Sequence, residues 1–171
     1  MILLNIGSNL ASKKGDRLFN LNKTLQLIKL EGIKIKKISS IYETPSYPNV
    51  KNPKFLNIGL EIECNYSPED LIRRCNKIEK KLERIRGKKN QPRTCDIDLI
   101  DYEGQIFNST KLTIPHQKAH LRNFVLFPIE EILPMWIHPT LNKRVDFLIK
   151  KLSFKLRNEI TRIEEHVTID Q

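Results

Sequence analysis

The stretch that decides the fold covers residues 55–71 and reads FLNIGLEIECNYSPEDL. Apolar residues alternate through its first half, which predicts a strand over 55–64 with one apolar face, made of Leu56, Ile58, Leu60 and Ile62. The second half is typical of a helix start, because a capping serine, a proline and two acidic residues follow one another at Ser67-Pro68-Glu69-Asp70. A strand therefore passes into a helix within a few residues.

The elements on either side follow from the same patterns. Residues 1–7 predict a strand, residues 15–30 an amphipathic helix, residues 33–42 a second strand and residues 44–54, which hold three prolines, a loop. The helix that starts at Ser67 is expected to extend to about residue 85 and to bury Leu71, Cys75, Ile78 and Leu82. Residues 96–101 predict a strand with a short partner near 106–107. Two helices follow, one from residue 122 to before Pro134 and one over 145–152.

The order β-α-β-β-α-β predicts an α+β protein, a ferredoxin-like two-layer α/β sandwich with a largely antiparallel sheet. A parallel dinucleotide-binding sheet is disfavoured, because the strands over 33–43 and 55–64 have no helix between them and no GxGxxG motif is present. We expect a single domain over residues 1–171, with 153–171 as a C-terminal helical or frayed tail, and not a fused bifunctional form.

The composition excludes several classes of protein. With 39% hydrophobic and 29% charged residues, the chain holds no apolar run near the ~20 residues of a membrane span, and its start lacks the basic region of a signal peptide. Three cysteines without a CxxC pair, Cys64, Cys75 and Cys95, argue against a disulfide framework or a zinc site. We therefore expect a cytoplasmic protein without membrane contact.

The net charge of +10 is concentrated in one segment. Residues 73–93 hold 10 basic and 2 acidic side chains, whereas the 94–171 segment holds 10 basic and 11 acidic ones. A local basic block predicts an anionic partner, either a nucleotide or a nucleic acid.

A pair of carboxylates follows this block. In a strand, Asp96 and Asp98 would lie on one face, roughly 6–7 Å apart along the chain. Mg²⁺ usually binds one or two carboxylates together with substrate phosphates, so the segment predicts a metal–polyphosphate site. The alternative is a solvated strand face, although the apolar residues Cys95, Ile97 and Leu99 assign the opposite face to the core.

Other candidates have structural alternatives of similar weight. Glu79, Arg84 and Arg86 fit either phosphate binding or helix solubility. His116, with Lys118 and Arg122 nearby, fits phosphate hydrogen bonding, while His138 fits a structural turn. A flat heterocycle would suit two aromatic rings and an amide, for which the candidates are Phe55, Phe124 and Asn57, although the pattern alone favours core positions for both rings.

Together these residues resemble a known family, the 6-hydroxymethyl-7,8-dihydropterin pyrophosphokinases of folate biosynthesis. The resemblance covers about residues 1–152, in the family's order. It rests on Gly7-Ser8-Asn9-Leu10, Ser39-Ser40-Ile41-Tyr42-Glu43-Thr44-Pro45, Phe55-Leu56-Asn57, Pro92-Arg93-Thr94-Cys95-Asp96-Ile97-Asp98, Pro115-His116, Arg122-Asn123-Phe124-Val125-Leu126-Phe127-Pro128, Glu131-Ile132-Leu133-Pro134 and His138-Pro139.

The resemblance implies a ferredoxin-like fold and an ATP-dependent diphosphotransferase that releases AMP. It implies that Asp96 and Asp98 bind two Mg²⁺ ions and act in catalysis with Arg84 and Arg93. The implied ATP-side residues are Asn76, Glu79, Arg84, Arg86, Arg93, Leu99, Lys111, Thr113, His116 and Arg122. The implied pterin-side residues are Thr44, Pro45, Phe55, Asn57, Asp96 and Phe124, with the two rings enclosing the pterin.

Some positions depart from the family's pattern. The segment over 87–91 lacks the tryptophan that often closes over the pterin, residues 46–50 differ in their loop pattern, and Gln117 replaces an aromatic residue or proline. We therefore expect slower or less tightly closed turnover. The partners expected are ATP and the pterin, with no nucleic acid, and the chain is expected to be a monomer.

Two alternatives to this function stay open at this stage. An RNA-binding module would share the fold and use the basic block, but the chain lacks the aromatic RNP motif. Another Mg²⁺-dependent transferase with a DxD pair would release pyrophosphate in place of AMP.

Overall fold

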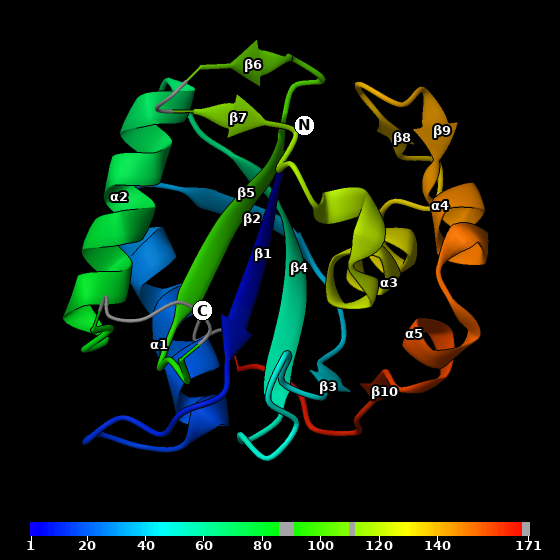
Figure 1. The fold of residues 1–171 in the computed structure, drawn as a ribbon. Coiled ribbons are helices and arrows are strands. Elements are labelled where there is room, and N and C mark those ends of the chain that lie inside the picture. Colours follow the sequence, from blue (N-terminus) through cyan, green and yellow to red (C-terminus); the bar gives the residue numbers. More distant parts are fainter. Residues whose placement is uncertain (86–90, 110–111, 169–171) are drawn as a thin grey trace.

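The computed structural model describes residues 1–85, 91–109 and 112–168. A six-stranded sheet lies at its centre (Figure 1) and is built from β1 (Ile2–Ser8), β2 (Lys34–Ile38), β3 (Tyr42–Thr44), β4 (Phe55–Glu63), β5 (Asp96–Tyr102) and β10 (Thr161–Arg162). The strand order is β10-β3-β4-β1-β5, with β2 also paired to β4, and each of these pairs is antiparallel. The expected antiparallel sheet is confirmed.

Two helices cover one face of the sheet, α1 (Arg17–Leu30) and α2 (Pro68–Lys81) (Figure 1). Each begins where the sequence supplies a cap, since Asp16 accepts a hydrogen bond from the Phe19 amide and Ser67 from the Asp70 amide. The core between helices and sheet buries the predicted apolar positions of the 55–64 strand and of the second helix. This half of the molecule is the expected two-layer sandwich.

A second set of helices covers the opposite face, α3 (Asn123–Ile132) and α4 (Val145–Lys151), around a separate apolar core that includes Leu3 and Ile100 of the sheet. Gly59 of β4 allows α3 to approach closely, because a Cβ at this position would lie 2.8 Å from Cβ of Pro128. The sheet is therefore held between two helical layers.

Short elements connect these parts. They are β6 (Phe107–Asn108), β7 (Thr113–Ile114), a 3₁₀ turn at Ala119–Leu121, β8 (Ile137–His138), β9 (Lys143–Arg144) and α5 (Phe154–Asn158). His138 accepts a hydrogen bond from the Leu141 amide on its Nδ1, at 3.3 Å, which confirms the turn predicted there. Among the residues described, no helix combines the length and the apolar character needed to span a membrane.

Two predicted boundaries are wrong. The strand expected over 33–42 is divided into β2 and β3, because the Ser39 hydroxyl accepts a hydrogen bond from the Gly59 amide at 2.9 Å in place of a regular ladder contact. The second helix ends at Lys81 and not near residue 85, and Glu83 has a φ of 61°. In the tail, the short helix α5 is followed by the strand β10, which pairs with β3.

Candidate active site

A cavity of about 760 Å³ lies over one end of the central strands. Its walls come from β1, β3, β4 and β5, from the C-terminal part of α2, from the start of α3 and from the chain around α5. A volume of this size accommodates small-molecule ligands.

The two aspartates lie together on β5, and both line this cavity. Cys95 and Leu99, on the opposite face, are buried in the core, as the alternation predicted. Three arginines neutralise the pair. Arg84 and Arg93 bind Asp96 at 2.6 and 2.9 Å, and Arg122 binds Asp98 at 3.3 Å. The anionic pair is thus surrounded by the cations that a polyphosphate would require.

Glu79 is buried, unlike an ordinary charged residue on the surface of a helix. It is only 2% exposed, and its Oε1 accepts hydrogen bonds from the Arg84 guanidinium and, at 2.9 Å, from the Ile97 amide. Arg84 therefore bridges Glu79 of α2 and Asp96 of β5. The helix-solubility interpretation of these two residues is wrong, because both are integrated into the cavity wall.

Burial shapes the protonation of the site. Desolvation, with the charge of Asp96 as the next cause, raises the pKa of Asp98 to about 6. Desolvation also lowers the pKa of His116 to about 4, and the positive charge of Arg122 adds to this effect. At neutral pH His116 is therefore an uncharged ring, able to accept or donate a hydrogen bond at the cavity wall.

The other half of the cavity combines aromatic rings with one amide. Asn57, on β4, is 2% exposed, and its Nδ2 donates to the Thr44 hydroxyl at 3.1 Å and to the Tyr42 carbonyl at 3.4 Å. Phe55 and Phe124 line the cavity and are only partly buried, with the guanidinium of Arg93 5.6 Å from the first ring and that of Arg122 5.4 Å from the second. The rings are thus available to a ligand rather than enclosed in the core.

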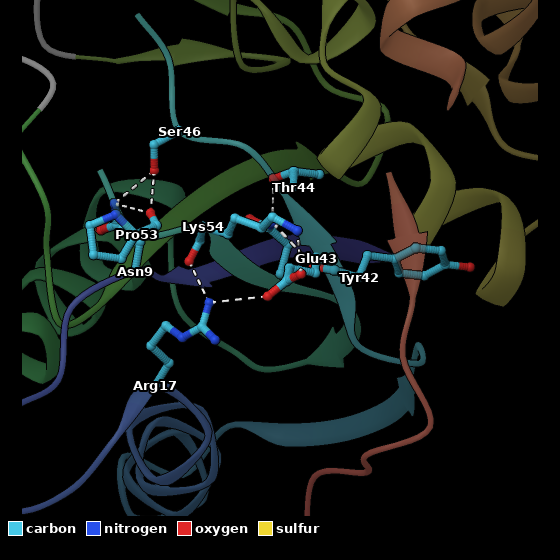
Figure 2. Close-up of polar contacts among 9 residues, drawn as sticks. Asn9, Arg17, Tyr42, Glu43, Thr44, Ser46, Pro53 and Lys54 are labelled. Atoms are coloured by element: carbon cyan, nitrogen blue, oxygen red, sulfur yellow. Dashed lines mark hydrogen bonds and ion pairs between the residues drawn. The ribbon is translucent and has the colours of Figure 1, made fainter. Parts of the chain in front are cut away.

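The loop between β3 and β4, residues 45–54, is fastened at its base (Figure 2). Asn9 donates to the Ser46 hydroxyl at 3.0 Å and to the Pro53 carbonyl at 3.2 Å. On the other side, Arg17 donates to the Lys54 carbonyl at 2.6 Å and to Glu43 at 3.3 Å. These contacts hold the loop beside the aromatic half of the cavity.

Asn9 also reaches the aspartate half. Its Oδ1 accepts from the backbone amide of Arg93 at 2.7 Å, and its backbone amide donates to the Arg93 carbonyl at 3.1 Å. One asparagine, 1% exposed, therefore joins the loop over 45–54 to the residue that binds Asp96.

Most predicted site residues meet in this cavity. Its lining includes Thr44, Pro45, Phe55, Asn57, Asn76, Glu79, Arg84, Arg93, Asp96, Asp98, His116, Arg122 and Phe124. Leu99 and Thr113 are not part of the lining, because Leu99 is a core residue and Thr113 is exposed on β7. Arg86, Lys111 and the tryptophan-free segment up to Asn90 lie outside the described residues.

Several further lining residues were not predicted as site residues, among them Asn5, Gly7, Leu156 and Glu159. The first two had a signal, since a polar and a small residue alternate within the otherwise apolar strand β1. A Cβ on Gly7 would lie 3.0 Å from Oδ1 of Asn57, so glycine leaves room for that amide. Leu156 and Glu159 had no signal, because only the turn of the C-terminal segment back onto the sheet brings them to the cavity.

The chain is similar to known proteins in sequence. Residues 3–134 match the family model described as 7,8-dihydro-6-hydroxymethylpterin-pyrophosphokinase (HPPK). A 2-amino-4-hydroxy-6-hydroxymethyldihydropteridine pyrophosphokinase from Aquifex aeolicus is 32% identical over 142 residues, which are 83% of this chain and 86% of that protein. The folic acid synthesis protein fol1 of Schizosaccharomyces pombe is 35% identical over 150 residues, 87% of this chain but only 20% of that much longer protein.

The fold has a solved counterpart in the Plasmodium falciparum HPPK-DHPS structure with pteroate. The TM-score is 0.71 at 13% identity, over 94% of this chain and 47% of that one. The likeness extends to the antiparallel sheet and the helices around it. The family model covers more than half of the chain, and the Aquifex aeolicus protein matches over most of its own length. The chain belongs to the 7,8-dihydro-6-hydroxymethylpterin-pyrophosphokinase family.

Proposed function

We propose that this protein transfers a pyrophosphoryl group from ATP to the hydroxymethyl oxygen of 6-hydroxymethyl-7,8-dihydropterin, giving the pterin diphosphate and AMP in folate biosynthesis. The observation that supports this most is the division of the cavity. Asp96 and Asp98, with three arginines, form one half, and two rings with a buried amide form the other. The first half suits a polyphosphate and the second a flat heterocycle.

The carboxylates fit magnesium. Asp96 and Asp98 are hard oxygen donors on one strand face, and no group of three or more histidine, cysteine or acidic side chains suited to a metal occurs among the described residues. Mg²⁺ is typically held in this way, by one or two carboxylates plus substrate phosphates. We propose two ions at this pair, where bound Mg²⁺ would neutralise charge on the transferring phosphates.

In this proposal the three arginines also bind the phosphates of ATP. When the carboxylates bind metal, Arg84, Arg93 and Arg122 can donate to phosphate oxygens. The pterin hydroxyl oxygen attacks the β-phosphorus, the bond from that phosphorus to the α,β-bridging oxygen breaks, AMP leaves with that oxygen, and the hydroxyl proton passes to solvent. Fixed positions and opposing charge account for most of the catalysis in such a transfer.

The residues on the pterin side of the cavity position the heterocycle. Asn57 offers an amide to the edge of the heterocycle, and Phe55 and Phe124 offer ring faces for stacking. His116, Asn76 and Glu79 complete the ATP side of the proposal. We also propose ATP-side roles for Arg86, Leu99, Lys111 and Thr113, which rest on the family pattern alone.

Two broader properties belong to the same proposal. All three cysteines are free thiols, which suits a reducing compartment such as the cytoplasm. We also propose that the protein acts as a monomer. RNA binding is the weaker alternative, since an RNA-binding surface gains nothing from a carboxylate pair that occupies its arginines.

The test is product analysis. The purified protein is incubated with ATP, 6-hydroxymethyl-7,8-dihydropterin and Mg²⁺, and nucleotides are separated by chromatography. We expect AMP in equal amounts with the pterin diphosphate, and none when pterin or Mg²⁺ is omitted. Release of pyrophosphate would indicate a nucleotidyl transferase, and salt-dependent RNA binding without AMP formation would indicate the RNA-binding alternative.

A further inference from the structure

Part of the cavity wall is built by the C-terminal segment, residues 153–162. Leu156 and Glu159 of this segment line the cavity. The segment lies beyond residue 134, where the match to the family model ends. Its contribution to the site is therefore a feature of this chain that the family match does not cover.

Several contacts fix the segment in place. The Asn123 side chain, at the start of α3, donates to the Leu156 carbonyl at 2.7 Å. Thr161 and Arg162 pair with Glu43 and Tyr42 of β3. Because β10 is antiparallel to β3, the residues before Thr161 approach the end of β3 where Thr44 and Pro45 line the cavity. Figure 1 shows β10 and β3 side by side.

Glu159 has one satisfied and one unsatisfied oxygen. Tyr47, from the loop over 45–54, donates its hydroxyl to Oε2 at 2.5 Å. Oε1 is enclosed and has no hydrogen-bond partner among the described residues. An enclosed carboxylate oxygen without a donor is unfavourable, so a rotation of the side chain that turns this oxygen to a ligand donor in the cavity gains affinity.

The strand order decides which part of the ligand reaches Glu159. Asp96 and Asp98 lie on β5 at one edge of the sheet, and β10 forms the other edge, four strand spacings or about 19 Å away. Asn57 of β4 and Thr44 of β3 lie between them. A pterin whose hydroxymethyl group faces the aspartates must therefore direct its pyrimidine end, with the 2-amino and ring N–H donors, toward Glu159.

We propose that Glu159 is a specificity-determining residue that accepts a hydrogen bond from the 2-amino-pyrimidine edge of the pterin, with Tyr47 holding its other oxygen. This inference rests on the proposed function, because it takes the pterin as the ligand. It assigns to the C-terminal segment a direct part in substrate recognition, in addition to the Asn57 amide.

The variant Glu159→Leu isolates this contact. Leucine keeps much of the side-chain volume but offers no acceptor to Tyr47 or to the pterin. Tyr47→Phe removes the hydroxyl but leaves the carboxylate free to accept from the ligand. Glu164→Gln is the matched control, because it removes one negative charge from an exposed position of the same C-terminal region.

The measurement is ligand affinity by calorimetry, with Mg²⁺ and a non-hydrolysable ATP analogue present. Two ligands are compared, the natural pterin and a pterin analogue with a methyl group in place of the 2-amino group. In the wild type and in the Glu164→Gln and Tyr47→Phe variants, the analogue should bind on the order of 10-fold or more weaker than the pterin. In Glu159→Leu the affinity for the pterin should fall by about the same factor, and the two ligands should bind about equally.

Two results would overturn the proposal. If Glu159→Leu still discriminated as the wild type does, the carboxylate would not contact the 2-amino edge. If Tyr47→Phe removed the discrimination as fully as Glu159→Leu, the pair would act as a structural tie. Both differ from failure of the proposed function, in which the wild type itself would form no AMP from ATP and the pterin.

Discussion

Single residues in this protein show where local pattern is sufficient and where it is not. Asp96 and Asp98 lie on one face of β5 because side chains alternate along a strand, so their proximity could be predicted from spacing alone. The burial of Glu79 could not be predicted, because it depends on the Ile97 amide and on Arg84, which only the packing of α2 against β5 brings to it. The position of Glu159 could not be predicted either, because its partner Tyr47 is distant in the sequence.

Replacing Asp98 with asparagine should stabilise the metal-free protein. The pKa of Asp98 in the fold, about 6, lies above the ordinary value of 3.8, so the folded state holds this proton more tightly than the unfolded chain. Stability is therefore lost as the pH rises from about 4 to 6, and the loss persists at pH 7. Asp98→Asn should recover about 1–3 kcal/mol at pH 7.

The measurement is chemical denaturation of both proteins in EDTA at pH 7 and pH 4. We expect the difference at pH 7 and little difference at pH 4, while the variant loses activity. If the variant were less stable than the wild type at pH 7, the ion pair between Asp98 and Arg122 would outweigh the cost of burying the carboxylate.

Replacing Asn57 with alanine should weaken pterin binding much more than ATP binding. The amide lies in the aromatic half of the cavity, away from the aspartates, and a site built to hydrogen-bond a ligand edge loses affinity when that partner is removed. The pterin KM should rise roughly 10-fold or more, with the ATP KM nearly unchanged. Equal changes in both KM values, at an unchanged Tm, would contradict this placement.

At the scale of elements, the regular parts were predicted from periodicity and caps, and the irregular parts were not. Ser67 and Pro68 start α2 as expected. The end of that helix at Lys81 is set by tertiary contacts, since the chain leaves the helix where Arg84 turns toward Glu79 and Asp96. The strand β10 was unpredictable, because two residues carry no periodic signal and β3 alone supplies their partner.

Replacing Asn9 with alanine should uncouple the loop over 45–54 from the aspartate half. Asn9 bonds both Ser46 and the Arg93 amide while buried, so its loss leaves several polar groups unpaired. We expect a loss of about 2–4 kcal/mol in unfolding free energy and weaker binding of both substrates.

Asn52→Ala is the matched control, because this asparagine lies in the same loop and its side-chain amide oxygen accepts only from the exposed Asn49. Substrate titrations and denaturation curves of both variants give the comparison. If Asn9→Ala weakened the pterin alone, the two halves would not be coupled through this residue.

At the scale of the whole molecule, the order of elements determined the sheet. The predicted β-α-β-β-α-β order recurs in the antiparallel sheet, with its second strand divided into β2 and β3 and with β1 between β4 and β5. The site follows from this topology, because the central strands bring Gly7, Asn57 and the aspartates to one end of the sheet. The second helical layer and the C-terminal wall were harder to foresee, since their apolar residues do not show which face of the sheet they cover.

The most direct test of the account is pterin-dependent AMP formation by Asp96→Asn, compared with the wild type and with Asp146→Asn, a control on α4 away from the cavity. The account predicts that Asp96→Asn loses at least about 100-fold in kcat while it stays folded, and that Asp146→Asn retains normal turnover. Near-normal AMP formation by Asp96→Asn would contradict the claim that the carboxylate pair is the catalytic centre.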